Sequence, residues 1–165
     1  MTSAPERISV LVLENDAAFA ATLEDELRAR GHLVETTSSV AQARERLRDG
    51  GFDVALLDLQ LPDGSGMEVL RDIGTEGLPV EALVMTGHAE VQTALEAMRL
   101  GAYDYITKPP RLEELQVLVA RAAEKARLRR ENVALRVRLR RHEPVQGFVT
   151  DDPWGDRQTP LPEAR

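Results

Sequence analysis

The sequence predicts an α/β fold, a doubly wound parallel sheet of five strands with helices on both faces. Three observations predict it. Five short apolar runs alternate along the chain with segments of helical apolar spacing. Glycines stand where helical segments should end. Parallel neighbours need crossover connections, which are usually helices, so this alternation favours a parallel sheet.

The five predicted strands are rich in Val, Ile or Leu and are four to six residues long. This length is typical of strands and too short for most helices. They cover residues 8–13, 33–37, 54–57, 80–85 and 103–107.

Between these runs, apolar residues recur every three or four positions, which predicts four amphipathic helices. Their apolar positions are Phe19, Leu23 and Leu27; Val40, Ala43 and Leu47; Met67, Leu70 and Ile73; and Val91, Leu95 and Met98. Ser39 stands where an N-cap would begin the second helix. Gly31, Gly50 and Gly101 stand where three of the helices should end.

A fifth, longer helix is predicted over residues 112–141, which contain no Gly or Pro and are dense in Leu, Ala, Arg and Glu. Its first half should pack on the sheet through Leu112, Leu115, Leu118 and Val119. Farther along, apolar or amide residues recur at intervals of 4, 3 and 4, namely Leu128, Asn132, Leu135 and Leu139. That spacing predicts the seam of a two-stranded coiled coil, with a polar residue fixing the register.

Charge divides the chain into three segments. Residues 1–110 carry 9 basic and 19 acidic side chains (−10), residues 111–142 carry 10 and 4 (+6), and residues 143–165 carry 2 and 5 (−3). The last segment has four Pro and no periodicity, so we expect disorder there. We therefore expect a domain over residues 1–122, a helical linker or coiled coil over 123–142, and a disordered tail over 143–165.

Several functional classes are excluded or disfavoured by composition. The chain has no Cys, which rules out disulfides, thiolate metal sites and Cys nucleophiles, and this fits a reducing compartment. No stretch ahead of residue 8 is long enough for a signal peptide or a membrane span. The glycine motifs of nucleotide-binding loops are missing, which disfavours nucleotide enzymes. We expect a cytoplasmic protein with no membrane partner.

Chemically useful side chains gather at the carboxyl ends of four predicted strands. They are Glu14, Asn15 and Asp16 after the first, Asp58 after the third, Thr86 after the fourth and Lys108 after the fifth. Strand ends of a parallel sheet share one edge, and carboxylates this close together need a cation, for which an oxygen-rich site suits Mg²⁺ or Mn²⁺. A hydroxyl and an ammonium opposite the acids suit a transferred phosphoryl group. Asp58 is then the natural nucleophile.

Three motifs around these side chains resemble response-regulator receiver domains of two-component systems. They are DVALLDLQLPDGSG at residues 53–66, VMTGHA at 84–89 and GAYDYITKP at 101–109. The resemblance covers about residues 8–120 and implies a flavodoxin-like sheet of order 2-1-3-4-5 with five helices, the last one extended. The long helix, with Glu131, Asn132 and Leu135, is similar to the linker of the nitrogen-regulator (sigma-54 activator) class, here without ATPase and DNA-binding domains.

The resemblance also implies roles for individual residues. Asp58 takes the phosphoryl group from a sensor histidine kinase, Thr86 and Lys108 bind its oxygens, and Tyr105 moves with Thr86 on switching. The implied ligands of Mg²⁺ are Glu14, Asn15, Asp58 and the backbone carbonyl of Gln60. Gln60 and His88 stand at the two positions that tune loss of phosphate. Such a domain is a phosphoacceptor, limited to self-phosphotransfer and autodephosphorylation, and not a conventional enzyme.

One position departs from the family pattern. The second acid expected after the first strand is Asn15. An amide oxygen can ligate Mg²⁺, but losing one negative charge should weaken binding. Asp16 would substitute if the loop shifted by one residue. Two functions therefore stay open: a phosphorylation switch that signals through its surface and a homodimer, and a degenerate receiver that acts as a phosphorylation-independent interaction module.

The arginines of the long helix could suggest nucleic-acid binding. They are Arg127, Arg129, Arg130, Arg136, Arg138, Arg140 and Arg141. No helix-turn-helix follows them, so we expect a solvated basic face on a linker helix and no direct DNA binding by this chain.

Overall fold

The computed structural model describes residues 7–87 and 91–142. Its parallel sheet has the order β2-β1-β3-β4-β5, as the flavodoxin-like prediction requires. The strands are β1 (Ser9–Leu13), β2 (Leu33–Thr37), β3 (Val54–Asp58), β4 (Glu81–Thr86) and β5 (Asp104–Thr107). The predicted fold class is confirmed, and the strand bounds differ from the expected ones by one residue at most.

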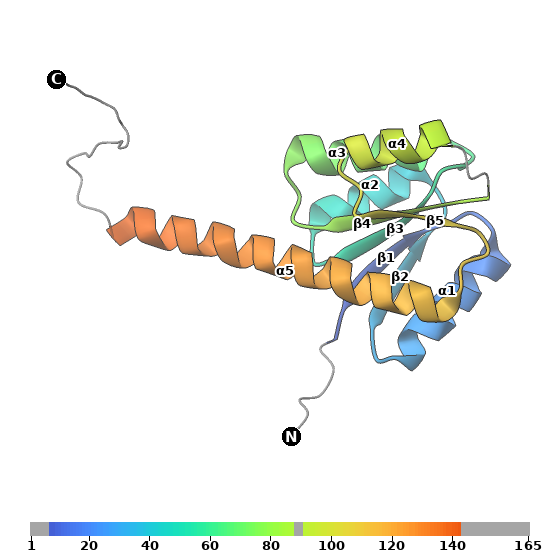
Figure 1. Ribbon diagram of the computed structural model, residues 1–165, viewed down its shortest axis with the longest axis horizontal. Coiled ribbons are helices and arrows are strands. Elements are labelled where there is room, and N and C mark those ends of the chain that lie inside the picture. The colour runs from blue at the N-terminus through green and yellow to red at the C-terminus, as the bar shows by residue number, and fades with distance from the viewer. Residues whose placement is uncertain (1–6, 88–90, 143–165) are drawn as a thin grey trace. The chain divides into compact units, whose positions relative to one another are not determined.

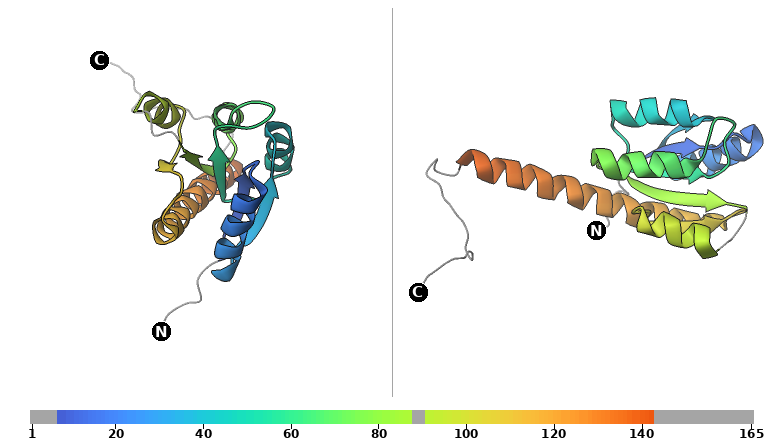
Figure 2. Two further views of the ribbon diagram at one scale, coloured as in Figure 1. Left: turned by 90° about the vertical axis from the view of Figure 1, so that its right-hand side faces the viewer. Right: turned by 90° about the horizontal axis from the view of Figure 1, so that it is seen from above.

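Helices cover both faces of the sheet (Figures 1 and 2). They are α1 (Ala17–Ala29), α2 (Val40–Asp49), α3 (Gly66–Glu76), α4 (Val91–Arg99) and α5 (Leu112–His142). Apolar residues of α1 and α5 pack on one face, and those of α2, α3 and α4 pack on the other. Strands β3 and β4 are buried along their whole length, which explains why their sequences are nearly continuous apolar runs.

Side-chain caps fix where the helices begin. Asp16 caps α1 by accepting a hydrogen bond from Phe19 N, and Ser39 caps α2 by accepting one from Gln42 N. Ser65 and Glu68 form a reciprocal capping box at the start of α3. These caps place three helix starts beside the carboxyl ends of the strands.

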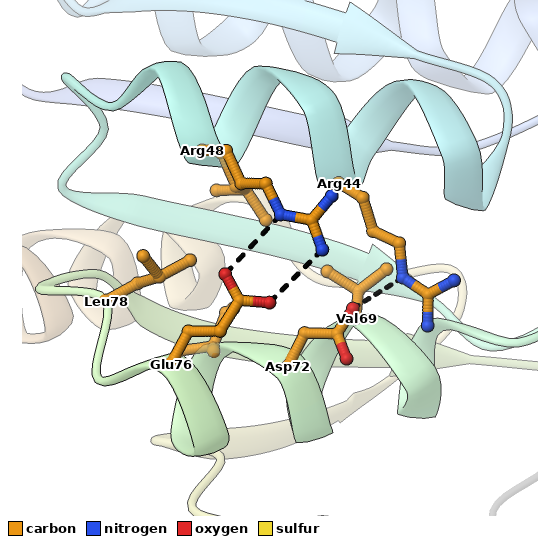
Figure 3. Close-up of a pocket in the computed structure, with 8 residues that line it drawn as sticks. Arg44, Arg48, Val69, Asp72, Glu76 and Leu78 are labelled. Atoms are coloured by element: carbon orange, nitrogen blue, oxygen red, sulfur yellow. Dashed lines mark hydrogen bonds and ion pairs between the residues drawn. The ribbon is translucent and has the colours of Figure 1, made fainter.

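Ion pairs join the neighbouring helices α2 and α3 beside a small pocket, and Figure 3 shows two of them. Arg44 Nε lies 2.5 Å from Asp72 Oδ2, and an Arg48 guanidinium nitrogen lies 3.2 Å from Glu76 Oε2. All four side chains are more than a quarter exposed. Exposed pairs of this kind contribute little to stability.

Helix α5 continues through the boundary between two compact units, which falls between Arg130 and Glu131. In the first unit its buried face includes Leu115, Val119, Ala123 and Ala126. Burial therefore extends past residue 122, where we expected the domain to end. In the second unit, the side chains of residues 131–140 are exposed.

The predicted tail, residues 143–165, lies outside the described residues. Within residues 7–87 and 91–142, no helix combines the length and the apolar character needed to cross a bilayer.

Candidate functional site

The strand register brings the predicted site residues to one edge of the sheet. Leu13 pairs with Leu57, so Glu14 and Asp58 come next on adjacent strands. Asp58 pairs with Met85, which puts Thr86 one residue farther along β4. Thr86 pairs with Thr107, and Lys108 follows.

Lys108 connects the two acids. Its Nζ lies 2.6 Å from Glu14 Oε1 and 3.4 Å from Asp58 Oδ2, and 5.0 Å from the centre of the Phe19 ring. Its backbone N–H donates to Thr86 O at 2.8 Å, which ties the end of β4 to the same residue. The Lys108–Pro109 peptide bond is cis.

Electrostatics keep the Lys108 ammonium charged. Burial by itself lowers the pKa of Lys108, but the hydrogen bond to Glu14 and the charge of Asp58 act in the opposite direction and together outweigh it. The net result is a raised pKa. At neutral pH this edge of the sheet therefore holds a positive charge between two carboxylates.

One ammonium does not balance two buried carboxylates. Glu14 is 3% exposed and Asp58 is 5% exposed. Glu14 Oε2 accepts a hydrogen bond from Asp16 N at 3.0 Å. Glu14 Oε1 is paired with the Lys108 ammonium at 2.6 Å. Two buried carboxylates thus share one ammonium, and a further cation would balance the second charge.

The donor set fits Mg²⁺ when neutral oxygens and water complete the shell. Within residues 7–87 and 91–142, no three Asp, Glu, His or Cys side chains gather closely enough to hold a metal by themselves. Mg²⁺ commonly binds through only one or two carboxylates and keeps several waters. Glu14 and Asp58 would supply the carboxylates, with Asn15 and the Gln60 carbonyl as neutral donors.

The residues that follow Glu14 have different surroundings. Asn15 is exposed, whereas Asp16 is the N-cap of α1, with its Oδ1 3.1 Å from Phe19 N. Using Asp16 as a metal ligand would compete with this cap. The geometry therefore favours Asn15 over Asp16 as the neighbour of Glu14 in the site.

The loop after Asp58 approaches that residue closely. Gln60 is exposed, and its N–H donates weakly to Asp58 Oδ1 at 3.5 Å. A Cβ added to Gly66 would lie 2.1 Å from the backbone oxygen of Asp58. Only glycine fits at this close approach, so Gly66 lets the start of α3 pack directly against the strand end that carries Asp58.

The other predicted residues are Thr86, Tyr105, His88 and the seam residues of α5. Thr86 is 3% exposed. Tyr105, which follows Asp104 on β5, is partly buried and packs against the core formed with α2, α3 and α4. His88 lies outside the described residues. The seam residues Leu128, Leu135 and Leu139 are more than half exposed, so they are available for a partner.

The opposite edge of the sheet holds a cluster that our reading of the sequence missed. Asp53 and Glu81, at the amino ends of β3 and β4, are 5% and 1% exposed. Arg127 and Arg130 pair with Asp53 at 3.3 and 2.5 Å, and Arg129 pairs with Glu81. The expectation of a merely solvated basic face is therefore wrong for these three arginines.

The missed cluster left a recognisable signal. An acid next to or inside an otherwise apolar strand run is unusual, because a buried carboxylate needs a partner. Two such acids and three closely spaced arginines on one helix together indicate ion pairing.

Comparisons with known proteins agree with this arrangement. Residues 10–120 match the response regulator receiver domain family. The chain is 33% identical to the transcriptional regulatory protein ZraR of Klebsiella oxytoca over 123 residues, 74% of this chain and 28% of ZraR. It is 31% identical to the alginate biosynthesis transcriptional regulatory protein AlgB of Pseudomonas aeruginosa over 157 residues, 91% of this chain and 35% of AlgB.

Among solved structures, the beryllofluoride-activated NtrC4 receiver domain dimer superposes with a TM-score of 0.68 at 28% identity. The match covers 72% of this chain and 98% of that one. The chain thus spans about a third or less of ZraR and AlgB, and nearly all of an isolated receiver.

Proposed function

Because this chain belongs to the response regulator receiver domain family of two-component systems, we propose that it accepts a phosphoryl group from a sensor histidine kinase on Asp58. One observation carries the proposal. The buried Asp58 carboxylate lies 3.4 Å from the Lys108 ammonium, and Thr86 follows the residue that pairs with Asp58 on the adjacent strand.

In the proposed reaction, a carboxylate oxygen of Asp58 attacks the phosphorus of the donor. An O–P bond forms, and the P–N bond to the donor's imidazole breaks with its electron pair on nitrogen. Lys108 neutralises charge on the phosphoryl oxygens, and the Thr86 hydroxyl donates a hydrogen bond to one of them. Mg²⁺ held by Glu14, Asp58, Asn15 and the Gln60 carbonyl would add charge neutralisation.

Phosphorylation would redistribute the contacts of Lys108. Its ammonium is shared between Glu14 and Asp58 before reaction, and a phosphoryl group on Asp58 offers it three more acceptor oxygens. Thr86 would move toward the same group, and Tyr105 would follow into the space that Thr86 leaves. Gln60 and His88 would then tune how quickly water removes the phosphate.

We further propose a homodimer formed through the seam residues of α5. Leu128, Leu135 and Leu139 are exposed, and Asn132 would favour a parallel, in-register pair. Arg129, which flanks the seam, is paired with Glu81 of its own chain, which weakens repulsion between two copies. Sedimentation should show that Leu135→Glu lowers the dimer fraction, whereas Val133→Glu does so less. If the wild type, Leu135→Glu and Val133→Glu all sediment as monomers, the dimer proposal is wrong.

Transcription regulation is proposed by likeness to ZraR and AlgB, whose printed names describe transcriptional regulatory proteins. We do not propose that this chain contacts DNA, because three of its arginines already pair with Asp53 and Glu81.

A second candidate function is a receiver that does not take phosphate and serves as a constitutive interaction module. The exposed Asn15 in place of a second acid favours it, because fewer carboxylates mean weaker metal binding.

Phosphorylation by a small donor separates the two candidates. With saturating Mg²⁺ and acetyl phosphate, intact-protein mass spectrometry should show one phosphate on the chain and none on Asp58→Ala. Asp49→Ala, at an exposed site on α2, is the matched control and should be labelled like the wild type. A chain that takes no phosphate would be the interaction module.

A further inference from the structure

The loop between β3 and α3 has a side chain at its turn that reaches a different helix. Leu61 N donates to Gly64 O at 3.0 Å, and Gly64 N donates to Leu61 O at 3.3 Å. Asp63 lies within this turn. Its position after Pro62 suggests an ordinary turn residue, and the printed sequence shows no nearby partner for it.

Both carboxylate oxygens of Asp63 accept hydrogen bonds from the start of α2. Val40 N donates to Oδ1 at 2.8 Å, and Ala41 N donates to Oδ2 at 3.1 Å. These N–H groups belong to the first turn of a helix, where intrahelical partners are missing and negative charge is favourable. The bond from Val40 N, followed by that from Ala41 N, lowers the pKa of Asp63.

Two side chains thus divide the capping of α2. Ser39, the N-cap, accepts from Gln42 N at 3.2 Å. Asp63 accepts hydrogen bonds from Val40 N and Ala41 N, which lie 23 and 22 residues before it in the chain. Losing either side chain weakens the same helix start, but only the loss of Asp63 releases the loop.

The released loop would be the one that borders Asp58. Gln60, three residues before Asp63, donates its N–H to Asp58 Oδ1 and would present its carbonyl to the metal. Gly66, three residues after Asp63, lies against the Asp58 carbonyl. The tether to α2 is therefore placed midway between the two points where the loop approaches the phosphoacceptor.

We propose that Asp63 is a positioning residue for phosphotransfer: by holding the β3–α3 loop against α2, it fixes the Gln60 backbone beside Asp58. This inference rests on the proposed function of Asp58. Asp63 touches no reacting atom and acts through the loop. Supporting groups of this kind commonly change metal affinity by about 10–100-fold. We expect about three- to tenfold here, because Asp63 acts through backbone.

The test compares Asp63→Ala and Asp63→Asn with Ser39→Ala as the matched control. Calorimetry gives the Mg²⁺ affinity, and mass spectrometry after removal of acetyl phosphate gives the rate of phosphate loss. We expect Asp63→Ala to change both by about three- to tenfold, Asp63→Asn to change them less because its amide oxygen keeps one bond, and Ser39→Ala to leave both within about twofold.

Amide hydrogen exchange supplies a readout that needs neither metal nor phosphate. Exchange at Gln60 should be faster in Asp63→Ala than in Ser39→Ala, while exchange at Val40 and Ala41 should rise in Asp63→Ala. The positioning role is wrong if Asp63→Ala and Ser39→Ala change Gln60 exchange and Mg²⁺ affinity to the same extent. It is also wrong if neither variant changes them. If the wild type takes no phosphate, the proposed function fails, and exchange at Gln60 still decides whether Asp63 holds the loop.

Discussion

The two edges of the sheet each bury two carboxylates, but their charges are balanced differently. At the carboxyl edge, Glu14 and Asp58 share one ammonium, that of Lys108. At the amino edge, two carboxylates face three guanidinium groups from α5.

This difference in charge balance indicates that the carboxyl edge is the functional one. At the amino edge each buried carboxylate has at least one arginine partner, so this cluster acts as structure. At the carboxyl edge two buried carboxylates share one ammonium, so a further cation bound there would be stabilised by the second charge.

The largest effect should come from breaking the amino edge. Replacing both Arg127 and Arg130 with Leu leaves Asp53 buried without a cation, because its remaining hydrogen bond comes from Ser9 N. Removing one side of a buried ion pair typically costs 3–5 kcal/mol, and the partial exposure of these arginines reduces the expected loss to about 2–4 kcal/mol. Urea unfolding curves measure it.

A triple variant provides the control. Adding Asp53→Asn to the two Leu substitutions removes the buried charge and should recover more than half of the lost stability. A loss below about 1 kcal/mol in the double variant would mean that these are ordinary surface pairs, and the contrast between the two edges would disappear.

A smaller effect should come from adding charge to the carboxyl edge. Asn15→Asp should tighten Mg²⁺ binding by about tenfold, equivalent to about 1.4 kcal/mol. Calorimetry is the suitable measurement, because the single Trp lies at position 154, far along the chain from this site.

Asp16→Asn is the paired control for that substitution. It keeps a capping side chain at the start of α1 and should leave Mg²⁺ affinity within about twofold. If Asp16→Asn weakens Mg²⁺ binding and Asn15→Asp changes nothing, the ligand after Glu14 is Asp16.

The smallest effect concerns pH. The pKa of Lys108 is raised in the folded protein, so its stabilising contribution is fully present below the unfolded pKa, about 10.4, and is lost as pH rises through the folded value. The stability difference between wild type and Lys108→Gln should therefore stay constant between about pH 6 and pH 9. If the stability difference decreases between about pH 6 and pH 9, the Lys108 ammonium does not remain charged over that range.

Sequence patterns could predict the carboxyl edge because its geometry follows from strand order. Asp58, Thr86 and Lys108 each come at or directly after the end of an apolar run, and parallel strands put those ends together. The amino edge depends on pairs 48 to 77 residues apart, such as Arg129 with Glu81 and Arg130 with Asp53. No local pattern specifies which face of α5 meets those acids.

The same limit explains Asp63. Its neighbours Pro62 and Gly64 predict a turn, but the partner that matters is the start of α2, which only the folded loop brings within reach. The tertiary fold, and not the local sequence, therefore determines what Asp63 binds.

The arginine pairs of α5 determine where this chain can be joined to other proteins. A fusion or truncation made at residue 122 would discard Ala123 and Ala126 from the core and leave Asp53 and Glu81 without their arginines. A junction placed after Arg130 keeps all of these contacts. Hybrid sensors that borrow this receiver should therefore carry its native helix through Arg130 and vary the graft only beyond that point.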